Sequence, residues 1–112
     1  MDYSNYSTLK IEMLDQGIML LTLNRPEKLN AVSHAMLDDL ADLWAKLRHD
    51  FDTRVVILQG AGEKGFCGGV DVKEGISEDL MHAPAFYEYQ TQLAELQLAM
   101  RKSPQPIIAL IH

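Results

Sequence analysis

The glycine-rich stretch at residues 64–73 holds the residues best suited to chemistry. It reads KGFCGGVDVK and follows a strongly apolar run at residues 55–58. The adjacent glycines Gly68 and Gly69 let the backbone pass close to a ligand and adopt angles that other residues avoid. Amide groups in such a segment can point at a ligand oxygen and stabilise negative charge on a reacting carbonyl. A plain glycine-rich turn between a strand and a short helix fits the same spacing.

A dinucleotide site is a further reading of this region, because residues 60–65 (GAGEKG) match the pattern G-x-G-x-x-G directly after an apolar run. The pattern binds pyrophosphate only when a helix opens at its end. Here Gly68 and Gly69 stand where the first helical turn would be. A nicotinamide-linked oxidoreductase rests on this pattern alone, and we expect the glycines to serve the exit from the strand.

Other reactive side chains have simpler explanations. Asp71 could act as an acid or base, but its place after two glycines favours capping of a short helix that begins there. Cys67 has no identified partner base, and we expect a small packed thiol. The four histidines, at positions 34, 49, 82 and 112, share no metal-ligand spacing, so we predict no metal site.

Taken with a second motif, LNRPEKLNA at residues 23–31, the glycine-rich stretch resembles the crotonase family, the enoyl-CoA hydratases and isomerases. The two motifs stand in the family's order, and the resemblance runs from about Leu9 to His112. It implies an α/β fold, the N-terminal part of the crotonase-type ββα spiral. Residues 1–112 would form a partial domain that ends before the glycine turn carrying the second oxyanion-hole amide.

The resemblance also implies roles for residues of both motifs. The backbone N–H of Val70 would be one donor of the oxyanion hole. Coenzyme A would enter as part of an acyl-CoA substrate, with no tightly bound cofactor. A solvated loop lysine explains Lys28 equally well. The residues that the resemblance places along the coenzyme A channel or near its adenine end are Lys28, Leu29, Ala31, Gly68, Gly69, Asp71 and Val72.

For the intact protein, the resemblance implies an enzyme that stabilises a thioester enolate, with hydration of 2-enoyl-CoA as the leading reaction. A homotrimer or dimer of trimers is the assembly expected of the family. The second amide and the acid–base carboxylates follow position 112 in the family, so we expect the 112-residue chain alone to be inactive. The alternative is a non-catalytic coenzyme A-binding or assembly module.

Apolar patterning predicts the elements that position these motifs. Alternation from Leu9 to Met13, a turn at residues 15–17 and an apolar run at 18–23 predict a β-hairpin whose second strand is more buried. Ser33 is a candidate N-cap for a helix over residues 33–49. Its apolar face would comprise Met36, Leu37, Leu40, Leu43, Trp44, Leu47 and Phe51.

The second half of the chain repeats this alternation of strand and helix. A strand at residues 55–59 leads into the glycine-rich stretch, and a helix is predicted over residues 84–101. A buried strand is predicted at residues 107–111. The order favours an α/β arrangement with helices crossing between strands. The stripe expected on the second helix comprises Phe86, Tyr89, Leu93, Leu96 and Met100.

Composition limits the classes of function. The 112 residues are 47% hydrophobic and 23% charged, which is typical of a small globular domain. The net charge is −6 with no basic cluster, which argues against a nucleic-acid partner. The first residues lack the basic and apolar regions of a secretory signal, and no apolar run is long enough to cross a membrane. With a single cysteine, a cytoplasmic location is expected.

Overall fold

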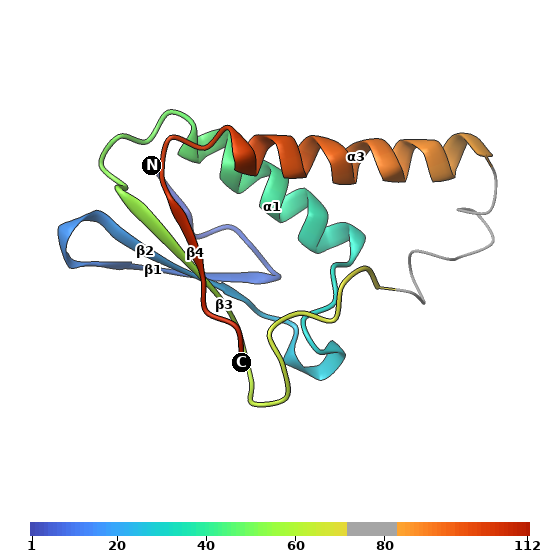
Figure 1. Cartoon of the computed structure of the whole chain (residues 1–112), viewed down its shortest axis with the longest axis horizontal. Helices are drawn as coiled ribbons and strands as arrows, with labels where there is room; N and C mark the ends of the chain where they lie inside the picture. Colours follow the sequence, from blue (N-terminus) through green and yellow to red (C-terminus); the bar gives the residue numbers. More distant parts are fainter. Residues whose placement is uncertain (72–82) are drawn as a thin grey trace.

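The computed structural model describes residues 1–71 and 83–112, in which a four-stranded sheet is packed with two α-helices (Figure 1). The predicted order of strands and helices is confirmed. In chain order the elements are β1 (Leu9–Leu14), the 3-10 turn η1 (Asp15–Gly17), β2 (Ile18–Leu23), the 3-10 turn η2 (Pro26–Lys28), α1 (His34–Leu47), β3 (Val55–Gly60), α3 (Ala83–Arg101) and β4 (Ile107–Ala109).

The sheet is mixed, with the strands in the order β1-β2-β3-β4. β1 and β2 form the predicted antiparallel hairpin, whereas β3 runs parallel to both β2 and β4. The second strand is the more buried, as predicted: Met19 and Leu21 are fully buried, while Met13 and Leu14 are exposed. A parallel pair needs a crossover, and α1 supplies it between β2 and β3. The carboxyl ends of these two strands therefore lie at one edge of the sheet.

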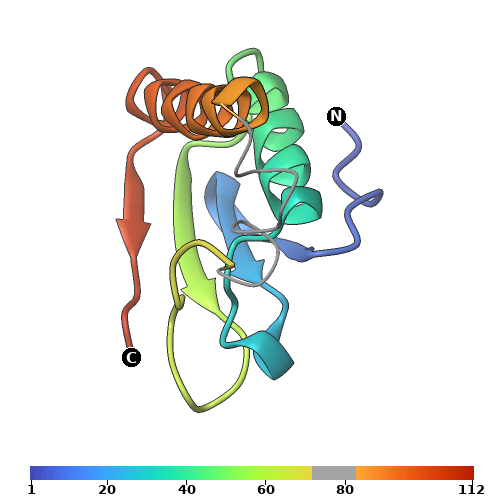
Figure 2. The same ribbon diagram turned by 90° about the vertical axis from the view of Figure 1, so that its right-hand side faces the viewer.

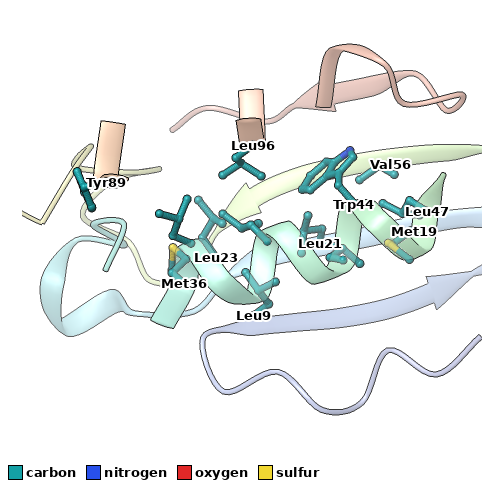
Figure 3. Packing of buried hydrophobic residues seen from close by; sticks show 13 residues of the cluster. Leu9, Met19, Leu21, Leu23, Met36, Trp44, Leu47, Val56, Tyr89 and Leu96 are labelled. Carbon is teal, nitrogen blue, oxygen red and sulfur yellow. The ribbon is translucent and has the colours of Figure 1, made fainter. Parts of the chain in front are cut away.

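Helix α1 begins as predicted. The Ser33 side chain accepts a hydrogen bond from the Met36 backbone N–H at 3.1 Å, which satisfies one of the unpaired donors of the first turn. In Figure 3 the side chains of α1, Trp44 among them, point toward those of the strands. Trp44 and Val56 belong to the same hydrophobic core. The buried face of α1 comprises Met36, Leu37, Leu40, Leu43, Trp44 and Leu47.

The prediction that Phe51 belongs to this apolar face is wrong, because its side chain is 80% exposed. The helix ends at Leu47, and the following turn is closed by polar contacts. The Asp50 carboxylate accepts from the Thr53 backbone N–H at 3.0 Å. The Gln105 side-chain amide donates to the carbonyl oxygens of Leu47 and Asp50 at 2.8 and 2.7 Å. These bonds turn the chain before Phe51 can continue the helical spacing.

Helix α3 packs against α1 and is less buried than its predicted stripe suggests. Tyr89 and Leu96 are buried, and Leu93 and Met100 are half-buried. The Phe86 side chain lies outside the described residues. Figure 1 shows α3 as the longest element, extending past the strands.

The C-terminal strand is shorter and more exposed than predicted. β4 ends at Ala109, and the fractional exposure reaches 51% at Ile108 and 76% at Ile111. The reason is its position, because among residues 1–71 and 83–112 β4 pairs with β3 alone and lies at the edge of the sheet. The prediction of a fully buried strand is therefore wrong for this structure.

The N-terminal segment is attached to α1 and to the turn after it by hydroxyl–carboxylate hydrogen bonds that the sequence did not suggest. Tyr3 donates to Asp50 at 2.6 Å, and Tyr6 donates to Asp42 at 2.8 Å. Burial and the bond to Asp42 raise the pKa of Tyr6 to about 12. For Asp50, burial alone would raise the pKa, but hydrogen bonds from Tyr3 and Thr53 outweigh it and lower the pKa to about 2.

Candidate functional site

The two motifs singled out in the sequence meet at one edge of the sheet. The turn after β2 and the loop after β3 lie side by side below the strands in Figure 2. Backbone hydrogen bonds join the two motifs: Ala61 N–H donates at 2.9 Å to the carbonyl oxygen of Leu23, the last residue of β2, and Gly68 N–H donates to Leu29 O at 2.8 Å. Parallel pairing of β2 and β3 thus brings residues 25–31 and 61–71 together.

Asn30 connects the two segments, a role that the sequence reasoning missed. Its side chain is fully buried, and its backbone has a φ of 54°, in the left-handed region that asparagine tolerates better than most residues. The side-chain oxygen accepts from the Arg25 N–H at 2.9 Å. The side-chain nitrogen donates to the carbonyl oxygens of Ala61, Gly65 and Phe66 at 2.9, 3.3 and 3.1 Å. The sequence signal that could have indicated this role is an asparagine within the turn between a strand and a helix.

Val70 forms an isolated parallel bridge with Val32. The Val32 N–H donates to Gly69 O at 2.7 Å, and the Asp71 N–H donates to Val32 O at 3.0 Å. Both bonds use the neighbours of Val70, so the bridge leaves the Val70 N–H on the other side. No acceptor in residues 1–71 or 83–112 bonds this N–H, and the residue is 40% exposed.

The orientation of the Val70 N–H is set by a single peptide unit. The Gly69 carbonyl and the Val70 N–H share one planar group, and in a trans peptide they point in opposite directions. Because the carbonyl is bonded to Val32, the N–H must face away from Val32. The hydrogen bond on the carbonyl also polarises the N–H of the same unit. Gly69 has a φ of +88°, a conformation that a side chain would strain.

The remaining predicted site residues differ in how close they lie to this peptide. A Cβ added to Gly68 would lie 3.7 Å from the Leu29 Cβ and 4.0 Å from the Ala31 Cβ, so the Gly68 backbone lies close to both side chains. Leu29 is 48% exposed, and Lys28 is an exposed residue on η2. Val72 lies outside the described residues.

Asp71 forms an ion pair that the sequence did not reveal. Its Oδ2 atom lies 3.2 Å from Nη2 of Arg25, with the two side chains 14% and 16% exposed. The short helix that Asp71 was expected to cap would fall outside the described residues, so its capping role stays a prediction. The Cys67 sulfur is half-buried and lies 3.4 Å from the Gly69 nitrogen.

The glycine pattern at residues 60–65 is not followed by the helix that a dinucleotide site requires. After β3 ends at Gly60, residues 61–71 form bends and irregular loop, and no helix begins in them. A groove of about 540 Å³ lies here instead, between Pro26, Glu27 and Leu29 on one side and residues 61–65 on the other.

Within the described ranges, no three His, Cys, Asp or Glu side chains gather as metal ligands. Neither described helix is long and apolar enough to span a bilayer.

Comparison with known proteins identifies the family. A sequence profile described as enoyl-CoA hydratase/isomerase matches residues 18–112. The (E)-benzylidenesuccinyl-CoA hydratase of Thauera aromatica is 47% identical over 57 residues, which cover 51% of this chain and 22% of that protein. The mitochondrial Delta(3,5)-Delta(2,4)-dienoyl-CoA isomerase of Rattus norvegicus is 30% identical over 96% of this chain and 35% of its own length.

The fold comparison agrees with the sequence match. The crystal structure of an enoyl-CoA hydratase from Mycobacterium smegmatis superposes with a TM-score of 0.85 at 34% identity, covering 91% of this chain and 38% of that one. The predicted fold is thus confirmed as part of the crotonase fold. The chain spans about a third of the length of the dienoyl-CoA isomerase and of several other curated relatives it matches. This chain belongs to the enoyl-CoA hydratase/isomerase family.

Proposed function

We propose that the intact protein containing this chain hydrates 2-enoyl-CoA thioesters, with the Val70 N–H as one donor of its oxyanion hole. The observation that carries the proposal is the peptide unit between Gly69 and Val70. Its carbonyl is bonded to Val32, and its N–H, on the exposed residue Val70, faces away from that bond. A fixed amide of this kind stabilises an oxyanion without reorganising during the reaction.

The proposed chemistry places charge where this donor acts. Water adds its oxygen to C3 of the enoyl group, and C2 then takes up a proton. Between these events, negative charge develops on the thioester oxygen as an enolate, and a donor 2.7–3.1 Å away stabilises it. The second amide and the acid–base carboxylates would come from segments outside this chain. We therefore expect the 112 residues alone to be inactive.

Coenzyme A recognition is proposed for the surface around the donor. Lys28, Leu29 and Ala31 would line the coenzyme A channel, and the backbone of residues 68–72 would lie near the adenine end. The Gly68 backbone lies close to Leu29 and Ala31, which supports a shared surface. Relatives named for benzylidenesuccinyl-CoA and dienoyl-CoA support an acyl-CoA substrate. Three further expectations stay predictions: assembly as a homotrimer or dimer of trimers, the lack of a tightly bound cofactor, and a cytoplasmic location.

The test replaces Val70 with proline, which has no N–H to donate. Hydration is followed in the intact protein by loss of the conjugated enoyl thioester absorbance. We expect Val70→Pro to lower kcat about 10²–10³-fold, the usual cost of one oxyanion donor. Val70→Ala is the matched control, because it keeps the amide and should retain most of the activity.

Two results would contradict the proposal. Wild-type rates in Val70→Pro would remove Val70 from the oxyanion hole. Tight acyl-CoA binding without turnover by the intact wild-type protein would favour the non-catalytic binding module.

A further inference from the structure

The Arg25 side chain joins the segments on either side of the Val32–Val70 bridge. Its Nη1 atom donates to Ala31 O at 2.6 Å, and its Nη2 atom lies 3.2 Å from Oδ2 of Asp71. Ala31 directly precedes Val32, and Asp71 directly follows Val70. One guanidinium group therefore holds the chain just before one bridge partner and just after the other.

The setting of this contact makes it more than a surface ion pair. The Arg25 and Asp71 side chains are only 16% and 14% exposed, so solvent screens their attraction weakly. A hydrogen bond between a guanidinium and a carboxylate carries a charge on both partners and is stronger than a neutral one. Arg25 is itself anchored, because its backbone N–H donates to the buried Asn30 side chain at 2.9 Å.

Asp71 is held at two points as a result. Its backbone N–H donates to Val32 O at 3.0 Å, and its carboxylate binds Arg25. Gly69, on the other side of Val70, is held through its carbonyl by Val32. Without Arg25, the Val70 peptide would keep its Gly69 anchor, but the chain after it would lose the bond between the Asp71 carboxylate and the guanidinium.

We propose that Arg25 is a positioning residue, which holds the bridged segments on either side of Val70, and with them the Val70 N–H, in place by bonding Ala31 and Asp71 at the same time. This inference rests on the proposed function, since it concerns the aim of the oxyanion donor. A planar guanidinium can bind two acceptors in a fixed relative orientation, whereas a lysine ammonium is a point charge on a flexible stem. A small misplacement of a group in an active site can cost about 10²-fold in rate.

The test compares Arg25→Lys, Arg25→Gln and Asp71→Asn in the intact protein. We expect kcat for enoyl-CoA hydration to fall about 10–100-fold in each variant, with KM changing much less. Arg25→Lys should lose nearly as much activity as Arg25→Gln, because a lysine keeps the charge but lacks the planar guanidinium that orients both acceptors. Arg48→Gln is the matched control: it removes one charge from an exposed arginine on the C-terminal side of α1, and its kcat should stay at the wild-type value.

A spectroscopic measurement separates positioning from general stability. The carbonyl stretching frequency of a bound, saturated ¹³C-labelled acyl-CoA falls when its oxygen accepts hydrogen bonds. We expect a clear downward shift in the wild-type protein and a smaller one in the Arg25 and Asp71 variants. If Arg25→Gln fails to fold, Arg25→Lys and Asp71→Asn decide the question by the same measurement.

The outcomes separate the two proposals. A full wild-type shift in folded Arg25→Lys and Asp71→Asn, with kcat unchanged or only KM raised, would overturn the positioning role and leave the Val70 donor intact. No shift in the wild-type protein with bound acyl-CoA would overturn the donor, and the positioning role with it.

Discussion

A Cβ atom on Gly60 would stand 2.7 Å from the side-chain nitrogen of Asn30, and it would also meet the Phe66 carbonyl group. The last residue of β3 thus has room for no side chain. The close approach lets Asn30 reach the carbonyl oxygens of the loop after β3.

Replacing Gly60 with alanine should therefore destabilise the protein. The added methyl group meets backbone as well as Asn30, so the loop must shift, and we expect a loss of about 2–3 kcal/mol in the free energy of unfolding. Gly65→Ala is the control, because nothing lies within 4 Å of its Cβ position. Urea unfolding of both variants measures the difference. Equal stability of the two would contradict the close packing at Gly60.

Replacing Asn30 with alanine should also lower the free energy of unfolding, because its side chain connects the two motifs. It leaves the Arg25 N–H and three carbonyl oxygens without their side-chain partner, and each buried group left unpaired costs about 1–3 kcal/mol. We expect a total loss of roughly 3 kcal/mol, because some of these groups will reach water. The exposed Asn24 offers a matched control, and Asn24→Ala should stay within about 0.5 kcal/mol of wild type. Thermal unfolding that finds both variants alike would contradict the connecting role of Asn30.

Asp50 should give the protein a measurable acid sensitivity. Its pKa falls from 3.8 to about 2 in the folded state, so the folded protein holds the charged form more strongly than the unfolded chain does. This stability is complete above the unfolded pKa and is lost as the pH falls through 3.8 toward 2. We expect a contribution of roughly 2 kcal/mol at neutral pH.

The measurement is the free energy of unfolding as a function of pH. In Asp50→Asn the acid-dependent loss should shrink by this contribution, since the variant has no carboxylate to protonate. Asp52→Asn, at an exposed neighbouring position, should keep the wild-type slope. An Asp50→Asn profile that runs parallel to wild type would show that other carboxylates cause the acid sensitivity.

Local patterning predicted the elements well because their signals lie within a few residues. Ser33 and the helical spacing from Met36 to Leu47 are both confirmed in α1. Phe51 continued that spacing by coincidence, because the bonds that end the helix come from Gln105, more than fifty residues away. The exposure of β4 likewise depends on its place at the sheet edge, which the order of elements does not show.

The candidate site likewise has one part that local sequence predicts and another that depends on distant contacts. The glycine-rich loop was found from its residue types, since adjacent glycines are a local signal. The ion pair between Arg25 and Asp71 spans 46 positions, and the three donations from Asn30 span 31 to 36. Such contacts exist only after β2 and β3 pair in parallel, so no local pattern announces them.

Because the proposed oxyanion donor is a main-chain N–H, it affects which amino-acid substitutions this protein tolerates. On the proposed mechanism, almost any amino acid at position 70 supplies the same N–H, so an alanine scan would pass over the group nearest the reaction. The same scan would register strongly at Arg25 and Asn30, whose side chains orient the loops. Selection would therefore act on the scaffold around residue 70, and its side chain could drift among relatives while the chemistry persists.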